Sequence, residues 1–193
     1  PQILTAPSVT RNQVGEVTIT PADRESVIYY TTDGRAPTPS SKKYNRPFMA
    51  DGKPEIRAMA YDLSTRKTSP ETLEKFDISR KDWKIVGIND EKDSAVLDGN
   101  PTTAWHQAKD KKMPQDVVIN LGKTENISGF RYLPDQSIWN PGIIADYEFY
   151  VSDDNLAWKL VSHGEFSNIK NNPLWQTVKF TSQKAQYIRL RAV

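Results

Sequence analysis

The segment Ala95–His106 places a carboxylate, a glycine turn, and amide and hydroxyl oxygens close together. A calcium ion takes about 6–8 oxygen ligands at 2.3–2.6 Å, many of them backbone carbonyls, so a tight loop with Asp98, Asn100 and Thr103 could supply much of a shell. The same residues are also typical of an Asx turn that Asp98 closes and Pro101 stiffens. The residues alone leave both interpretations open.

Composition argues against several other chemistries. The chain of 193 residues contains no cysteine, which excludes disulfides, thiol nucleophiles and thiolate metal sites. Its histidines, His106 and His163, are too far apart for a local zinc motif. We find no nucleophile elbow, no phosphate loop and no recognisable catalytic pair of carboxylates. With 26 Lys and Arg against 24 Asp and Glu, nucleic acid is not an expected partner, and no apolar stretch is long enough to predict a membrane span.

A second group of residues is suited to sugars, which need a planar apolar surface for the ring and polar groups for the hydroxyls. Trp139 lies among polar residues in the loop Asp135–Gly142, beside Asn140, and its indole is a candidate stacking platform. The alternative is a tryptophan folded over the rim of a sandwich. Trp175 leaves both alternatives open, and strand position predicts core roles for Trp83, Trp105 and Trp158.

Short runs of β-branched and aromatic residues between prolines and glycines predict an all-β protein. No long segment has a helical apolar period, and only helical turns are expected, near Ser79–Asp82 or Ala95–Leu97. We predict two β-sandwiches, over residues 1–78 and 79–193. The expected strands are Glu16–Thr20, Val27–Thr32, Ile56–Tyr61 and Thr72–Ile78, and then Trp83–Ile88, Asp116–Leu121, Ile127–Leu133, Asp146–Ser152, Trp158–His163, Gln176–Phe180 and Tyr187–Ala192.

Several consecutive motifs in the second part resemble the factor V/VIII type C, or discoidin, domain, and more narrowly a family-32 carbohydrate-binding module. They are the Ala95–His106 segment, Asp116–Gly122, Ile127–Pro134, Tyr147–Asp154 and Tyr187–Ala192. The resemblance covers about Ser79–Val193 and implies a discoidin-like jelly roll.

The first part resembles the fibronectin-III-like C-terminal domain of chitobiase-type hexosaminidases. The motifs are Gly15–Thr20, Ile28–Gly34, Pro37-Thr38, Tyr44, Pro47-Phe48 and Ile56–Ala60. This pair of domains resembles the C-terminal part of a secreted exo-glycosidase, such as a hexosaminidase, a chitobiase or an alpha-L-fucosidase. A secreted, periplasmic or cell-surface location is the corresponding expectation.

The resemblance implies a structural calcium held by the carbonyls of Ala95 and Asn100, the carboxylate of Asp98, and Thr103 through its carbonyl and hydroxyl.

For galactose-binding members the resemblance implies a shallow sugar site, to which Glu91 and His106 correspond. Their arginine in a Leu-Pro-Arg-Gln segment is replaced here by Asp135. A carboxylate only accepts hydrogen bonds, so we expect N-acetylated or fucosylated glycans to fit at least as well as galactose, and acidic sugars to be repelled. With Trp139 and Asn140, these residues form the expected carbohydrate-binding set. The alternative is that Asp135 faces away from the site and leaves recognition to Trp139 and Asn140.

The resulting prediction is a non-catalytic module that binds glycans of glycoproteins or polysaccharides and targets an attached, upstream glycoside hydrolase domain. The alternatives are a glycosidase in its own right and a spacer or protein-interaction module that binds no sugar.

Overall fold

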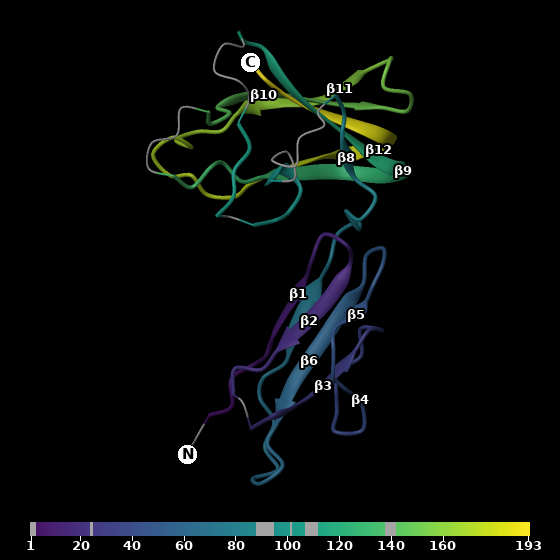
Figure 1. Ribbon diagram of the computed structural model, residues 1–193, viewed down its shortest axis with the longest axis vertical. Coiled ribbons are helices and arrows are strands. Elements are labelled where there is room, and N and C mark those ends of the chain that lie inside the picture. The colour runs from purple at the N-terminus through teal and green to yellow at the C-terminus, as the bar shows by residue number, and fades with distance from the viewer. Residues whose placement is uncertain (1–2, 24, 88–94, 101, 107–111, 138–141) are drawn as a thin grey trace. The chain divides into compact units, whose positions relative to one another are not determined.

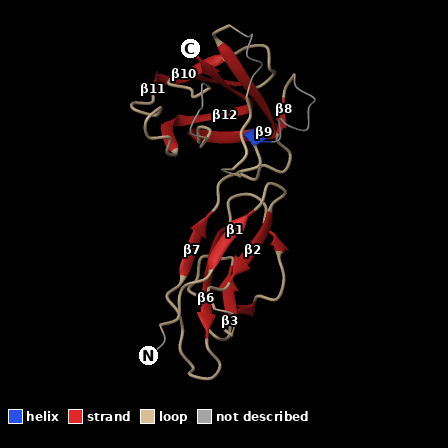
Figure 2. Cartoon of the chain, turned by 60° about the vertical axis from the view of Figure 1, so that its left-hand side comes forward, coloured by secondary structure: helices blue, strands red, loops and turns tan. Residues whose placement is uncertain are grey.

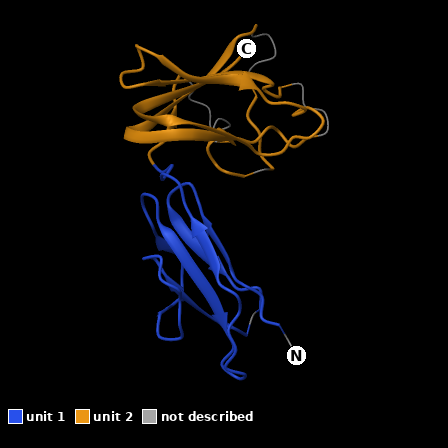
Figure 3. Cartoon of the chain, turned by 180° about the vertical axis from the view of Figure 1, so that it is seen from behind, with its two compact units in different colours: residues 1–81 blue, residues 82–193 orange. Residues whose placement is uncertain are grey.

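The computed structural model describes residues 3–23, 25–87, 95–100, 102–106, 112–137 and 142–193. The chain divides into two compact units, Pro1–Lys81 and Asp82–Val193 (Figure 3). Both consist of strands and loops, with a short 3₁₀ turn that includes Ala95 and Val96 (Figure 2). The described residues contain no helix with the length and apolar character needed to cross a membrane.

The first unit contains two antiparallel sheets (Figure 1). One has the order β1-β2-β5 and the other the order β4-β3-β6-β7. The strands are β1 (Ser8–Arg11), β2 (Glu16–Thr20), β3 (Val27–Thr31), β4 (Lys42–Lys43), β5 (Phe48–Met49), β6 (Glu55–Tyr61) and β7 (Thr72–Lys75). Strands β1, β4 and β5 were not predicted, because they are short and carry no clear apolar alternation.

The two sheets of the first unit enclose a common core. Alternate residues of β2 and β3 are buried, as expected for strands with one face inward. Tyr30 of β3 stacks on Phe48 of β5 with ring centroids 4.8 Å apart, so an aromatic contact joins the sheets. The buried cluster consists of Val9, Val17, Ile19, Ile28, Tyr30, Ile56 and Ala58. This arrangement is the small β-sandwich that the sequence predicts.

The second unit is built on a five-stranded sheet of order β11-β10-β12-β9-β8. The strands are β8 (Lys84–Ile85), β9 (Gln115–Tyr132), β10 (Asp146–Ser152), β11 (Lys159–Glu165) and β12 (Gln176–Ala192). The last strand of the chain, β12, lies at the centre of this sheet, between β10 and β9 (Figure 1). The all-β class and the jelly-roll fold are confirmed.

The long strands β9 and β12 replace four strands of the prediction, which was wrong on this point. Their pairing begins at Gln176↔Tyr132 and reaches Ala192↔Gln115. Register shifts between Lys179 and Gln183 and between Ala185 and Tyr187 accommodate the residues that lie between the predicted strands. These bulges keep the strands paired, so no separate loop is needed to satisfy the backbone.

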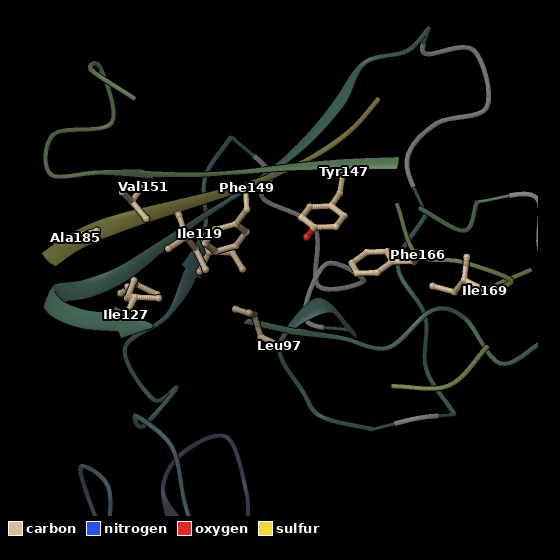
Figure 4. Packing of buried hydrophobic residues seen from close by; sticks show 11 residues of the cluster. Leu97, Ile119, Ile127, Tyr147, Phe149, Val151, Phe166, Ile169 and Ala185 are labelled. Atoms are coloured by element: carbon tan, nitrogen blue, oxygen red, sulfur yellow. The ribbon is translucent and has the colours of Figure 1, made fainter. Parts of the chain in front are cut away.

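Both halves of β9 face the same core. Ile119 from the first half and Ile127 from the second belong to one buried cluster (Figure 4). Aromatic rings fill its centre: Phe149 stacks on Phe130 at 4.3 Å, and Tyr147 stacks on Phe166 at 4.5 Å. The β9–β12 pair therefore wraps around the hydrophobic core.

Gly129 allows β9 and β12 to approach closely at the irregular part of their pairing. A Cβ atom at this position would lie 2.3 Å from the carbonyl oxygen of Val178, which is closer than atoms tolerate. Only glycine fits here without moving the backbone of β12.

We predict that Phe149→Ala destabilises the second unit by about 3–5 kcal/mol, because it removes a ring that is 2% exposed and leaves a cavity beside Phe130. All 5 tryptophans lie between Trp83 and Trp175, so tryptophan fluorescence during urea unfolding reports on this unit alone. The control, Leu156→Ala at an 84% exposed position, is expected to change stability by no more than about 0.5 kcal/mol. Equal effects of the two substitutions would contradict the packing described.

Candidate functional site

The predicted sugar-binding residues divide into two groups in the structure. His106 and Asp135 are described, and the structure brings their side chains together. Glu91, Trp139 and Asn140 lie outside the described residues. Their assignment remains a prediction from the sequence.

The position of Asp135 is set by the end of β9. The strand ends at Tyr132, and Pro134, which is fully buried, anchors the chain before it turns. Asp135 then closes an Asx turn: its Oδ1 accepts the N–H of Ser137 at 2.8 Å and its Oδ2 accepts the Ser137 hydroxyl at 3.0 Å. The carboxylate is therefore held in one orientation by its own loop.

His106 contacts this carboxylate from a different loop. Its Nε2 lies 2.9 Å from Asp135 Oδ2, the distance of a hydrogen-bonded pair. The imidazole is 48% exposed, whereas the side chain of Asp135 is only 15% exposed. Asp135 is thus the more buried member of the pair, and His106 presents the remainder of its ring to solvent.

The surroundings keep Asp135 ionised. Burial opposes the charged form, but the N–H and hydroxyl of Ser137 and the side chain of His106 together lower the pKa of Asp135 below its usual range. Tyr132 is influenced in the opposite direction, since burial and the charge of Asp135 raise the pKa of its phenol. The tyrosine oxygen accepts the N–H of Ile144 at 3.1 Å, which ties the chain after the site to the end of β9.

Gln136 connects the Asp135 loop to the segment that precedes β12. Its side-chain amide donates to the carbonyl of Pro134 at 2.7 Å and to the carbonyl of Pro173 at 2.9 Å. The pairing of Gln176 with Tyr132 holds the adjoining strand ends side by side. The loop after β9 and the segment before β12 are thereby held at one edge of the second unit.

Trp175 is the aromatic residue at this edge that the sequence left undecided. It comes directly before β12 and is 51% exposed. The guanidinium of Arg131, on β9, lies 4.8 Å from the centroid of its ring, an orienting cation–π contact. The sequence indicated only weakly that Trp175 is exposed, because its exposure depends on the register in which β9 and β12 pair.

Two of the predicted core tryptophans have different environments. Trp83 is partly buried and packs against the core of the second unit. Trp158 is not part of that core. Its ring and that of Tyr150 contact the guanidinium of Arg189, at 4.5 and 4.2 Å from the ring centroids.

The loop predicted to bind calcium is closed by hydrogen bonds around Asp98. Its Oδ1 accepts the N–H of Asn100 at 2.8 Å, as in an Asx turn. The Thr103 hydroxyl lies 2.6 Å from Asp98 Oδ2 and 3.0 Å from the carbonyl oxygen of Asn100. A hydroxyl has one proton and can satisfy only one of these acceptors, whereas a cation would satisfy all three oxygens.

This oxygen set fits a hard cation better than a transition metal. Across the described ranges, no three His, Asp or Glu side chains come together. A metal at this loop would depend on one carboxylate together with hydroxyl and carbonyl oxygens, which are ligands of calcium. Ala95 lies in the 3₁₀ turn just before this loop.

Comparison with known proteins gives two family matches. Residues 82–193 match the F5/8 type C domain family, and residues 17–74 match the Fn3 associated family. A sialidase of Micromonospora viridifaciens is 33% identical over 124 residues, which are 62% of this chain and 18% of the sialidase. This chain therefore corresponds to a small part of that relative.

Two solved structures are similar to this chain. The module CpGH89CBM32-5 of Clostridium perfringens, in complex with GalNAc-β-1,3-galactose, is 26% identical with a TM-score of 0.50, over 57% of this chain and 82% of the module. The C-terminal domain of a chitobiase from Bacteroides fragilis shares the fold at 24% identity and a TM-score of 0.50, over 60% of this chain and 83% of that domain.

These matches confirm both resemblances that the sequence motifs indicate. The matched region 82–193 contains the five-stranded sheet, the Asp98 loop and the edge that carries His106, Asp135 and Trp175. The chain belongs to the F5/8 type C domain family.

Proposed function

We propose that the second unit is a non-catalytic glycan-binding module, and that the edge formed by the end of β9 and the start of β12 is its binding surface. The observation that carries this proposal is the half-exposed indole of Trp175, which lies on the segment that Gln136 joins to the loop of Asp135, the partner of His106. An exposed aromatic ring next to oriented polar groups is the combination that a pyranose requires.

Each group at this edge has a distinct role in the proposal. The face of Trp175 packs against the C–H face of a sugar, and the guanidinium of Arg131 limits the orientations of the ring. His106 supplies a polar contact to a hydroxyl. Trp139, Asn140 and Glu91 complete the proposed set from the sequence.

The similar solved structure from Clostridium perfringens supports this choice of ligand class, since that module is in complex with GalNAc-β-1,3-galactose. Because the negative charge of Asp135 at this edge repels other anions, we propose that neutral N-acetylated or fucosylated glycans are favoured over acidic ones. The sugar ligands are then glycans of glycoproteins or polysaccharides.

We further propose that the module serves an attached glycoside hydrolase, as its likeness to a sialidase suggests. A millimolar affinity corresponds to roughly −4 kcal/mol, which is weak alone. Tethering to a catalytic domain raises the effective concentration of its substrate, so weak binding is sufficient. We propose a secreted, periplasmic or cell-surface location, because such glycans are accessible there.

One prediction concerns Trp175 as the stacking platform for the sugar. The chain is screened on a glycan array, and the affinity of the best neutral glycan is then measured by titration calorimetry. We expect Trp175→Ala to weaken this affinity more than about tenfold, equivalent to roughly 1.4 kcal/mol, because the apolar stacking surface is lost.

Trp158→Ala is the matched control, since this indole stacks on Arg189 near the opposite end of β12 and should leave binding unchanged. Binding that survives Trp175→Ala but not Trp139→Ala would move the platform to Trp139. A chain that binds no glycan on the array would favour the spacer or protein-interaction function.

The second prediction concerns calcium at the Asp98 loop, which we propose as a structural ligand of this unit. A ligand that binds only the folded state adds about 2.7 kcal/mol at a hundredfold excess over its Kd. We therefore expect added calcium to raise, and chelator to lower, the unfolding midpoint measured by tryptophan fluorescence.

Asp98→Ala should abolish this response, because it removes the one carboxylate of the oxygen set. Asp154→Ala removes a comparable turn, in which Asp154 accepts the N–H groups of Leu156 and Ala157, and should leave the response intact. If neither calcium nor chelator changes the unfolding midpoint, the Asp98 loop is a plain Asx turn that binds no calcium.

A further inference from the structure

The hydrogen bonds of Asp135 leave little of its carboxylate for a ligand. An ionised carboxylate offers about four lone-pair sites. The N–H and hydroxyl of Ser137 and the Nε2 of His106 occupy three of them. The side chain of Asp135 is also mostly buried, at 15% exposed.

The charge state of Asp135 determines which nitrogen of His106 carries the proton. An ionised carboxylate has no proton to donate, so the contact at 2.9 Å requires the hydrogen on Nε2. The Ser137 hydrogen bonds favour this ionised form and thereby help to lower the pKa of Asp135. In a neutral imidazole, Nδ1 is then left with a lone pair and acts only as an acceptor.

The exposure of His106 makes this second nitrogen available. Nearly half of the side chain is exposed, and within the described parts of the chain Asp135 is its only hydrogen-bond partner. His106 contacts Asp135, whose loop Gln136 joins to the segment before β12, and Trp175 belongs to that segment.

We propose that Asp135 is a positioning residue that fixes His106 as the Nε2–H tautomer and makes its Nδ1 the acceptor for a hydroxyl of the bound sugar. Asp135 thus acts on specificity through His106, with a preference for a ligand hydroxyl that can donate a hydrogen bond. This inference rests on the proposed glycan-binding function, but the tautomer is a property of the free protein.

The tautomer is measured without sugar by NMR of the ¹⁵N-labelled full chain, in long-range ¹H–¹⁵N spectra of the histidine rings. The chain contains 2 histidines, and His163→Gln assigns the signals of His106. At a pH where the ring is neutral, we expect His106 Nε2 to give a pyrrole-type signal and Nδ1 a pyridine-type signal. Asp135→Asn retains an acceptor oxygen and should largely preserve this pattern.

Asp135→Ala removes the acceptor, so the two ¹⁵N signals of His106 should move toward each other as the tautomers interconvert. A Nδ1–H tautomer in the wild-type chain would overturn the proposal. So would identical His106 signals in the wild-type and Asp135→Ala chains when both have native-like backbone spectra. Neither outcome depends on whether the chain binds glycans, so failure here is distinguishable from failure of the proposed function.

The consequence for recognition is tested with the best neutral glycan of the array and its deoxyfluoro analogues, in which one hydroxyl at a time is replaced. One analogue should bind the wild-type chain roughly two- to tenfold more weakly, the usual effect of a lost hydrogen bond, and should show no such penalty with His106→Ala. If every analogue loses the same affinity in both chains, His106 does not accept a sugar hydroxyl.

Discussion

The pairing of β9 with β12 is the constraint on which the rest of the second unit depends. Gln176 lies opposite Tyr132 at one end and Ala192 opposite Gln115 at the other, so one register sets the positions of two long strands. Side chains from both halves of β9 enter the same core, and the close approach at Gly129 holds the irregular middle of the pair together. A slip of one residue would reverse which side chains face inward.

The candidate site is a direct product of that register. Asp135 follows the end of β9 and Trp175 precedes the start of β12, so pairing the two strands brings both residues to one edge. Gln136 then fixes the distance between their loops through the carbonyl of Pro173. Rigid strands carry the loops, and short local hydrogen bonds orient the polar side chains on them.

The sequence could predict the parts of this fold that depend on local periodicity. Strands β2 and β10 have the predicted bounds, because apolar and polar residues alternate clearly along them. Residues around Gly122 and Thr181 resemble turns, yet the structure keeps them within long strands, since pairing across the sheet outweighs local preference. Bulges of this kind have no reliable signature in one sequence.

The candidate site was harder to predict from the sequence, because its contacts also depend on strand pairing and not on local sequence. His106 and Asp135 could be selected by residue type and resemblance, but their contact joins loops that only the folded sheet brings together. Residue type suggested a direct sugar contact for Asp135, and the sequence could not show that its carboxylate also accepts hydrogen bonds from Ser137 and His106. The exposure of Trp175 likewise follows from its place beside the strand pair.

The central position of β12 also has a consequence for biosynthesis. This strand is the last of the second unit, yet it forms the middle of the sheet, and its residue Ala192 pairs with Gln115, far earlier in the sequence. Contacts of such wide sequence separation form slowly, because a long loop must close before they stabilise anything. On the ribosome, the first unit has all its strands while the second still lacks its centre, so folding proceeds one unit at a time. Until β12 has been made, the edges of β9 and β10 that face it lack their partner strand, and an unpaired strand edge favours association with other chains.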